Sequence, residues 1–192
     1  MYGRCNEKMP TSNPLNIVEY RIKFLSYFIK QDYKTLLDIS CGDSKYLEYW
    51  RWKGLTVAGT EFDDNKIKYC EGLNIPCDKL DLNDKNMKID YNDNSIDFLT
   101  CTEVLEHVKN PKKVVTEMIR VAKHLVLITV PVYKSFYSKE HINLWDQADA
   151  LLNSLLDIKH KDKIDICCDI VVTKPEDWGL NQRSFILALY KK

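Results

Sequence analysis

No excess of charge of either sign is present in this sequence of 192 residues. Lysine and arginine together number 28, and aspartate and glutamate also number 28. The chain as a whole therefore lacks the strong positive field that favours binding to a nucleic-acid backbone or to an anionic membrane surface. A local basic patch is still compatible with this balance.

Long apolar runs are also missing. The first twelve residues are polar and do not resemble a secretory signal. No run approaches the roughly 18 apolar residues that a membrane-spanning helix needs. We therefore expect a cytoplasmic protein with no membrane partner.

Paired cysteine motifs are a third absence. The seven cysteines are an odd number and include no C-x-x-C spacing, so the sequence supports neither a zinc motif nor a disulfide framework. Most of them lie in apolar runs, where a thiol packs as a small hydrophobic side chain. A nucleophilic cysteine is the alternative interpretation. The seven are Cys5, Cys41, Cys70, Cys77, Cys101, Cys167 and Cys168.

The sequence does contain an alternation of strand-like and helix-like segments. With 45% hydrophobic residues, the chain can fill the core of one domain, which we expect to span residues 1–192. Helical periodicity predicts an N-terminal helix at 15–30, within a segment 1–33 that packs on the core. It also predicts helices at 44–53, 63–72, 111–122 and 145–156. Apolar runs predict strands at 36–39, 55–60, 75–80, 95–101, 124–132, 164–172 and 184–190.

Polar side chains stand where the first four predicted strands end. Parallel strands joined by helices make right-handed crossovers, and such sheets bind ligands at the carboxyl ends of their strands. The last two strands have no clear helix between them, which predicts an antiparallel pair at the sheet edge. Each side chain at a strand end has an ordinary alternative role, such as a helix cap or a turn former. Their shared position nevertheless predicts a ligand site that contains Asp38, Glu61, Asp81 and Cys101.

Residues 34–132 resemble the class I S-adenosylmethionine-dependent methyltransferases, in particular the branch with ubiquinone-pathway O-methyltransferases and sugar methyltransferases. The resemblance rests on the run 36–43, on the run 55–60 that ends in Glu61, and on the segment 103–108. It implies an α/β fold of three layers around a Rossmann-like seven-stranded sheet, mostly parallel with an antiparallel last strand. It also implies S-adenosylmethionine as the cofactor.

The resemblance assigns roles in donor binding to individual residues. Asp38 would orient the methionine amino group, and Glu61 would accept two hydrogen bonds from the ribose diol. Phe62 would pack on adenine, and Asp81 with Leu82 would meet its polar edge. Arg21 loosely matches a position that binds the methionine carboxylate in some relatives. The cofactor-binding set predicted in this way is Arg21, Asp38, Ser40, Gly42, Glu61, Phe62, Asp81, Leu82 and Cys101.

The glycine motif departs from the family pattern. Where the family reads D-x-G-x-G-x-G, this chain has serine at the first and third glycine positions, Ser40 and Ser44, and keeps only Gly42. Either serine would be strained if its position required a positive φ angle. A serine hydroxyl is small, however, and can hydrogen-bond locally or to the cofactor.

Two histidines are the candidate catalytic bases. His107 and His141 each follow a strand expected to border the donor, whereas His124 and His160 have no such position. Glu103, Glu106 and His107 also have the i, i+3, i+4 spacing of one helical face. With His141, they resemble the E-x-x-E-H set with a distant histidine that holds a divalent ion in small-RNA 2′-O-methyltransferases. Magnesium, manganese or zinc would suit that set, although many relatives carry Glu-His here without a metal.

Three functions remain open from the sequence. The first is O-methylation of a small molecule such as a sugar or a phenol, with N-methylation close to it. The second is metal-dependent 2′-O-methylation of RNA, which the neutral charge balance does not favour. The third is a degenerate domain that serves as a scaffold. The sequence is compatible with a monomer or a homodimer.

Overall fold

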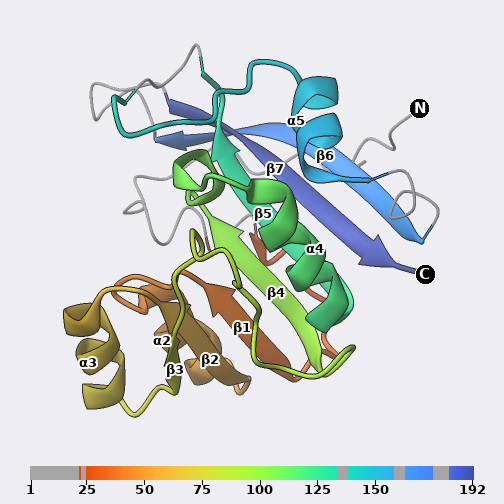
Figure 1. Cartoon of the computed structure of the whole chain (residues 1–192). Coiled ribbons are helices and arrows are strands. Elements are labelled where there is room, and N and C mark those ends of the chain that lie inside the picture. Colours follow the sequence, from red (N-terminus) through yellow and green to blue (C-terminus); the bar gives the residue numbers. More distant parts are fainter. Residues whose placement is uncertain (1–21, 23–24, 134–137, 158–162, 175–181) are drawn as a thin grey trace.

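The computed structural model contains a seven-stranded sheet with helices packed on it (Figure 1). It describes residue 22 and residues 25–133, 138–157, 163–174 and 182–192. The strands are β1 (Thr35–Ile39), β2 (Thr56–Glu61), β3 (Cys77–Lys79), β4 (Ile96–Thr102), β5 (Ala122–Pro131), β6 (Ile164–Lys174) and β7 (Gln182–Lys191). The helices are α2 (Lys45–Trp52), α3 (Asp64–Gly72), α4 (Pro111–Val121) and α5 (Ala148–Leu155), with a short 3-10 helix η1 (Leu105–His107).

The strand order β3-β2-β1-β4-β5-β7-β6 determines where a ligand can bind. Strands β1 to β5 pair in parallel, and β7 is antiparallel to both of its neighbours, β5 and β6. The predicted α/β class, the seven strands and the antiparallel last strand are therefore confirmed. The order reverses at β1, which lies between β2 and β4, and ligands of such sheets occupy the crevice at the carboxyl ends beside that reversal.

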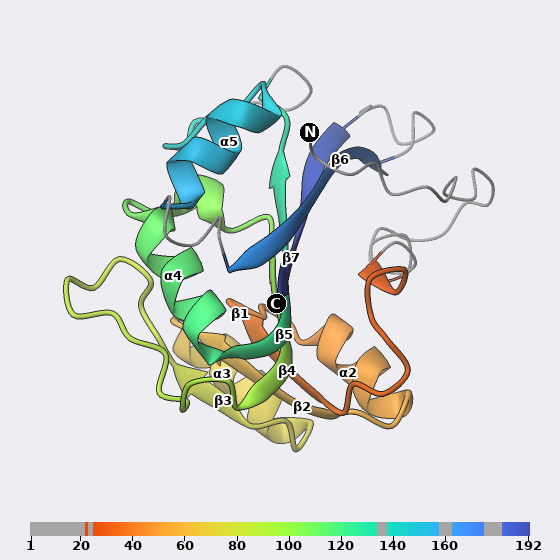
Figure 2. The same ribbon diagram turned by 90° about the vertical axis from the view of Figure 1, so that its right-hand side faces the viewer.

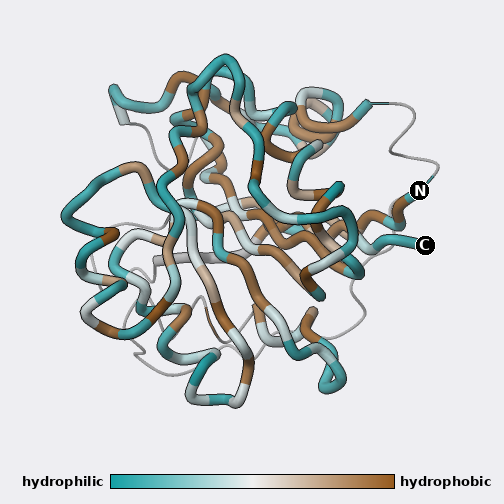
Figure 3. Tube along the Cα trace, turned by 60° about the horizontal axis from the view of Figure 1, so that its bottom comes forward, coloured by the Kyte–Doolittle hydropathy of each residue, from teal (hydrophilic) through white to brown (hydrophobic). Residues whose placement is uncertain are grey.

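Each face of the sheet has its own hydrophobic core, which makes the fold three-layered. Figure 2 shows α4 and α5 on one side of the sheet and α2 on the other. Val114 and Met118 of α4 and Leu152 of α5 belong to the first core. Leu47 of α2 and Cys70 of α3 belong to the second. In Figure 3 the hydrophobic stretches run mainly along the central strands, while the outer loops are mostly hydrophilic.

Local signals in the sequence explain where the helices begin and end. Asp63 caps α3 because its carboxylate accepts hydrogen bonds from the N–H groups of Asn65 and Lys66. Asn110 caps α4 in the same way, immediately before Pro111. Gly54, with a φ of 92°, lies just beyond the end of α2, as expected of a glycine stop.

Most element predictions are confirmed, and some boundaries differ. β3 is limited to three residues, and the helix predicted at 145–156 begins only at Ala148. Most of the helix predicted at 15–30 lies outside the described residues, but Leu25 and Phe28 are buried in the second core. Within the described part of the chain, no helix is long and apolar enough to cross a membrane.

Arg120 on α4 anchors the long connection between β3 and β4. Its guanidinium donates to the carbonyl oxygens of Ile89 and Tyr91 at 2.7 and 2.8 Å. It also forms ion pairs with Glu117 and Asp93, both at 2.8 Å. Arg120 therefore holds the later part of this connection, from Ile89 to Asp93, against α4.

We expect the substitution Arg120→Met to lower the free energy of unfolding by about 2 kcal/mol. The methionine fills similar volume but leaves two backbone carbonyls and the Glu117 carboxylate without their charged donor. Urea denaturation of the two proteins measures the difference. The exposed ion pair of Lys79 with Asp64 offers a control, because Lys79→Met should change stability by less than about 1 kcal/mol. Equal effects would show that Arg120 has no special anchoring role.

Candidate active site

A cavity of about 600 Å³ lies at the carboxyl ends of the parallel strands. Its walls come from the segments that follow β1, β2, β3 and β4, which are far apart in the sequence. The structure thus brings together several residues that the sequence predicts for the site. Those among its lining residues are Ser40, Phe62, Asp81, Leu82, Glu103 and His107.

The loop after β1 has left-handed backbone at all three positions of the glycine motif. Ser40, Gly42 and Ser44 have φ angles of 59°, 59° and 58°. The loop is held by β2, because the N–H of Cys41 donates to the carbonyl oxygen of Thr60 at 2.9 Å. Gly42 adopts this conformation freely, whereas both serines pay the steric cost of a Cβ atom in the left-handed region.

We expect Ser40→Gly to raise the free energy of unfolding by about 1 kcal/mol, because it removes that steric cost. Ser40→Ala is the matched control. It keeps a Cβ at the same φ angle, so it should bring no gain. Ser44→Gly should gain less than Ser40→Gly, since the Ser44 hydroxyl contacts the Cys70 thiol at 2.6 Å. Denaturant titration of the three variants measures the order, and a gain in Ser40→Ala would contradict the explanation.

Glu61, the last residue of β2, organises the backbone around the cavity. Its carboxylate is buried and accepts N–H groups from Gly42 at 3.0 Å, Phe62 at 2.9 Å and Asp63 at 3.2 Å. The side chain therefore ties the loop after β1 to the segment after β2. A carboxylate offers about four acceptor positions, so one position, on Oε2, remains for a ligand hydroxyl in this arrangement.

Asp38 is a buried carboxylate on β1. It is 2% exposed, and it accepts a hydrogen bond from the Thr100 hydroxyl of β4 at 2.6 Å. Burial raises the pKa of Asp38 to about 7, with the Thr100 hydrogen bond opposing and the Glu61 charge adding to the increase. Ionising a buried acid with such a pKa costs free energy at neutral pH. A cation that binds beside the carboxylate makes the ionised form favourable.

The side chains that follow β2 and β3 are suited to a flat heterocycle. The Phe62 ring is 61% exposed although it lines the cavity. Asp81 accepts the N–H of Asn83 at 2.8 Å, which fixes the turn at the end of the opposite wall. Leu82 lines the same wall. In one cavity, an exposed ring can stack on a purine and a carboxylate can accept a hydrogen bond from its polar edge.

Two residues of the predicted donor set, Cys101 and Arg21, are not part of the site as the structure describes it. Cys101 on β4 has no exposed surface and belongs to the core beneath α4. A fully buried thiol in an apolar core offers the donor neither a charge nor a strong hydrogen-bond partner, so we leave Cys101 out of the proposed site. Arg21 lies outside the described residues.

The segment after β4 corrects one structural prediction. Glu103, Glu106 and His107 do not share one helical face, because η1 begins only at Leu105 and Glu103 has a φ of 55°. Glu106 and His107 nevertheless meet His141 from the segment after β5. Ligand atoms of these three residues all lie within 4.8 Å of one another. The two imidazole rings are 4.9 Å apart in an edge-to-face arrangement.

Asn143 positions His141, and nothing in the sequence analysis identified it. Its side-chain amide donates to the carbonyl oxygens of Leu105 at 3.0 Å and Val108 at 2.6 Å. The backbone N–H groups of Ile142 and Asn143 both donate to the carbonyl oxygen of Glu106. These contacts join two segments that are about 35 residues apart, and an asparagine two residues after a histidine was the only signal in the sequence.

Comparison with known proteins identifies relatives of the central part of the chain. The family described as "Methyltransferase domain" matches residues 37–128. The ubiquinone biosynthesis O-methyltransferase of Dechloromonas aromatica (strain RCB) is 30% identical over 122 residues, which are 58% of this chain and 47% of that protein. The chain spans about half the length of the curated relatives it matches.

Solved structures share the fold over most of the chain. A SAM dependent methyltransferase from Archaeoglobus fulgidus has a TM-score of 0.68 at 16% identity, covering 91% of this chain and 93% of its own. The [4+2]-cyclase SpnF has a TM-score of 0.71 at 15% identity, covering 99% of this chain and 87% of its own. One fold therefore carries differently named activities, and the reaction has to be argued from the site.

Proposed function

We propose that this chain, which belongs to the class I S-adenosylmethionine-dependent methyltransferases, transfers a methyl group from S-adenosylmethionine to a hydroxyl of a small molecule. One arrangement carries the proposal. Two buried carboxylates, Asp38 and Glu61, flank the left-handed loop at adjacent strand ends, beside a cavity of about 600 Å³.

Each donor group has a chemically suited partner in this arrangement. The Asp38 carboxylate would pair with the methionine ammonium, and Glu61 would accept the ribose diol, one hydroxyl at its remaining acceptor position and the other in place of a backbone N–H. Gly42 would let the backbone approach the donor. It has no side chain, and the space that a Cβ would enter holds no protein atom within 4 Å. Phe62 would stack on adenine between Ser40 and the wall of Asp81 and Leu82. Arg21 stays a prediction for the methionine carboxylate.

Methyl transfer from a sulfonium is an in-line displacement in which the acceptor oxygen forms a bond to carbon as the carbon–sulfur bond breaks. Alignment alone can contribute roughly 7 to 11 kcal/mol to such a reaction. A hydroxyl acceptor must also lose a proton, and the proposed bases are His107 and His141. Burial and the neighbouring His107 lower the pKa of His141, so its ring is neutral at neutral pH and can accept that proton.

The same histidines could instead bind a divalent ion. The grouping of Glu106, His107 and His141 within 4.8 Å supports it, with Glu103 on the same cavity wall. A bound ion would lower the pKa of the acceptor hydroxyl. The carboxylate and imidazole donors fit magnesium, manganese or zinc.

The surroundings of His141 favour a small acceptor with an apolar part. Ile142 is 57% exposed, Leu144 45% and Tyr133 39%, and the N–H of Tyr133 donates to the carbonyl oxygen of Trp145, which joins their segments. Among the described residues that line the cavity, Lys66 is the single lysine or arginine that could pair with a phosphate. A phenol or sugar hydroxyl therefore suits the site better than RNA does.

Calorimetry with S-adenosylmethionine, followed by transfer of its labelled methyl group to a panel of acceptors, tests the proposal. The panel contains a catechol, a monosaccharide, a primary amine and an RNA oligonucleotide. We expect donor binding and labelling of the catechol or the sugar. Labelling of RNA alone, with affinity that falls steeply with salt, would overturn the choice of acceptor. No heat and no thermal shift at millimolar donor would overturn the enzyme and favour a scaffold.

A further inference from the structure

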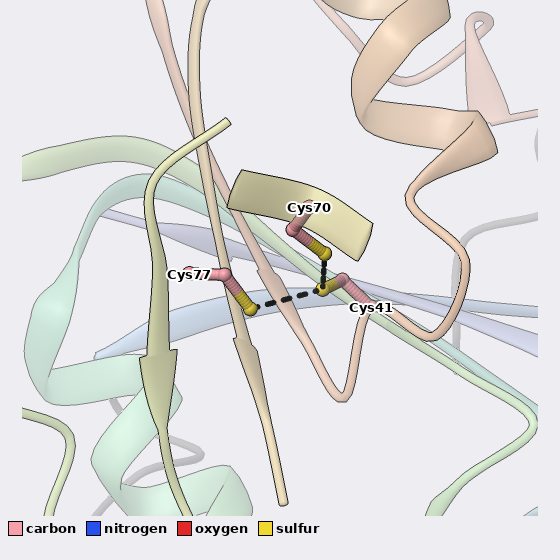
Figure 4. A group of neighbouring side chains, drawn as sticks. All are labelled: Cys41, Cys70 and Cys77. Carbon is pink, nitrogen blue, oxygen red and sulfur yellow. Dashed lines mark hydrogen bonds between the residues drawn. The ribbon is translucent and has the colours of Figure 1, made fainter. Parts of the chain in front are cut away.

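Three cysteines that are distant in the sequence meet beneath the loop after β1. Cys41 lies in that loop, Cys70 lies in the last turn of α3, and Cys77 begins β3. Figure 4 shows the Cys41 sulfur between the other two, 3.9 Å from Cys70 Sγ and 3.7 Å from Cys77 Sγ. The three sulfurs all lie within 4.8 Å of one another.

We propose that Cys41, Cys70 and Cys77 form a three-sulfur binding site for a thiophilic metal cation of the Zn²⁺ or Cu⁺ kind. Two thiolates on a tetrahedral zinc ion, with zinc–sulfur bonds of 2.3 Å, are about 3.8 Å apart. The observed sulfur separations of 3.7 and 3.9 Å bracket that value, so the side chains need little movement to reach one ion. Thiolate ligands select these two soft cations over magnesium or calcium.

The surrounding backbone is shaped around the central thiol. A Cβ atom added to Gly59 on β2 would lie 2.4 Å from Cys41 Sγ and 3.0 Å from Cys41 Cβ. Only a glycine at this position leaves room for the Cys41 side chain. Cys41 and Cys70 are buried and Cys77 is half-buried, so an ion can enter from the side of β3.

Oxygen groups support the sulfurs. The Ser44 hydroxyl lies 2.6 Å from Cys70 Sγ and 3.9 Å from Cys41 Sγ, where it can donate a hydrogen bond to a bound thiolate. Burial first, and the Asp38 charge after it, raise the pKa of Cys41, and burial likewise raises the pKa of Cys77, so both thiols hold their protons until an ion displaces them. On binding, three S–H protons pass to solvent, three metal–sulfur bonds form, and no electrons are exchanged.

Occupancy would fasten the loop after β1 to α3 and β3. Cys41 directly precedes Gly42, whose N–H donates to Glu61 at 3.0 Å. A bound ion would therefore hold the loop conformation that the proposed donor site uses. The metal site itself does not depend on the proposed methyltransferase activity, because its ligands and their geometry stand apart from the donor contacts.

Metal titration of the whole chain, prepared with chelator and reductant, tests the site. Zn²⁺ is added in one arm and Cu⁺, under anaerobic conditions, in the other. X-ray absorption spectroscopy then reads the ligands of the bound ion. We expect one equivalent with three sulfurs, at about 2.3 Å for zinc, and a rise in melting temperature. The two cations should differ in coordination number. Zinc should add a nitrogen or oxygen ligand to the three sulfurs, and copper should not. A shell of nitrogen and oxygen only would overturn the proposal and assign the ion to Glu106, His107 and His141.

Variants separate this site from the rest of the chain. Cys77→Ser should weaken binding by roughly 100-fold or more, whereas Cys168→Ser, another half-buried free cysteine, should leave the affinity unchanged. His141→Ala should also keep the three-sulfur ion, even where turnover is lost. Wild-type affinity in Cys77→Ser would overturn the proposal. The absorption spectrum of the wild-type chain decides the question even if Cys77→Ser does not fold.

Discussion

Replacing Asp38 with asparagine is expected to stabilise the free protein and to weaken its binding of S-adenosylmethionine. The carboxyl pKa of about 7 compares with 3.8 for the ordinary group, a difference of about three units. Above pH 7 the folded protein therefore carries a penalty on the order of 4 kcal/mol for ionising Asp38. Asparagine keeps an oxygen for the Thr100 hydroxyl but carries no charge.

The pH dependence gives this prediction its sign. Because the folded state has the higher pKa, it binds more protons than the unfolded state between about pH 4 and 7, so this group's contribution to stability falls as pH rises through that window. The gain from Asp38→Asn should therefore be largest at pH 8 and nearly absent below pH 4. Urea denaturation at several pH values measures it, with exposed Asp90→Asn as the control.

Donor affinity should change in the opposite direction. In the wild type, the affinity should fall about tenfold for each pH unit below 7, because the protonated acid cannot pair with the methionine ammonium. In Asp38→Asn it should be roughly 100-fold weaker and independent of pH between 5.5 and 8, since about 3 kcal/mol of buried charge pairing is lost. Unchanged affinity in calorimetry would remove Asp38 from the donor site.

Replacing His141 with alanine is expected to lower turnover by about 10²- to 10⁴-fold, with donor affinity nearly unchanged. The ring lies 4.9 Å from that of His107, which lines the cavity, and burial lowers the pKa of His141, so its neutral ring can serve as the proposed base. Wild-type turnover at saturating donor should persist to a lower pH than an ordinary histidine allows, because protonation of His141 occurs later on acidification.

Two controls define the role of His141. His124 lies near the amino end of β5, at the end of the sheet opposite to the proposed site, so His124→Ala should keep full turnover. A chelator separates the two mechanisms, because wild-type activity that survives it indicates a base, and activity that it abolishes indicates a metal ligand. Equal losses of affinity and turnover in His141→Ala would show a structural role instead.

Asn143 illustrates why part of the site could not be predicted. The histidines were recognisable because the chain has only four of them, and the acidic residues were recognisable because they follow apolar strands. Asn143 acts through two backbone carbonyls of a turn that no local pattern places beside it. The helical spacing of Glu103, Glu106 and His107 predicted the wrong local structure, since a positive φ at Glu103 breaks the helix. The meeting of Glu106 with His107 and His141 comes from strand order instead.

The sequence by itself determined the alternation of strands and helices, the helix starts near Asp63 and Pro111, and the placement of Asp38, Glu61 and Asp81 at strand ends. These features depend on periodicity and on contacts within a few residues. Only the tertiary structure decided that Ser40 and Ser44 take left-handed backbone and that Cys41, Cys70 and Cys77 converge. The reason is physical: sheet pairing brings together segments whose separation along the chain carries no record of their distance in space.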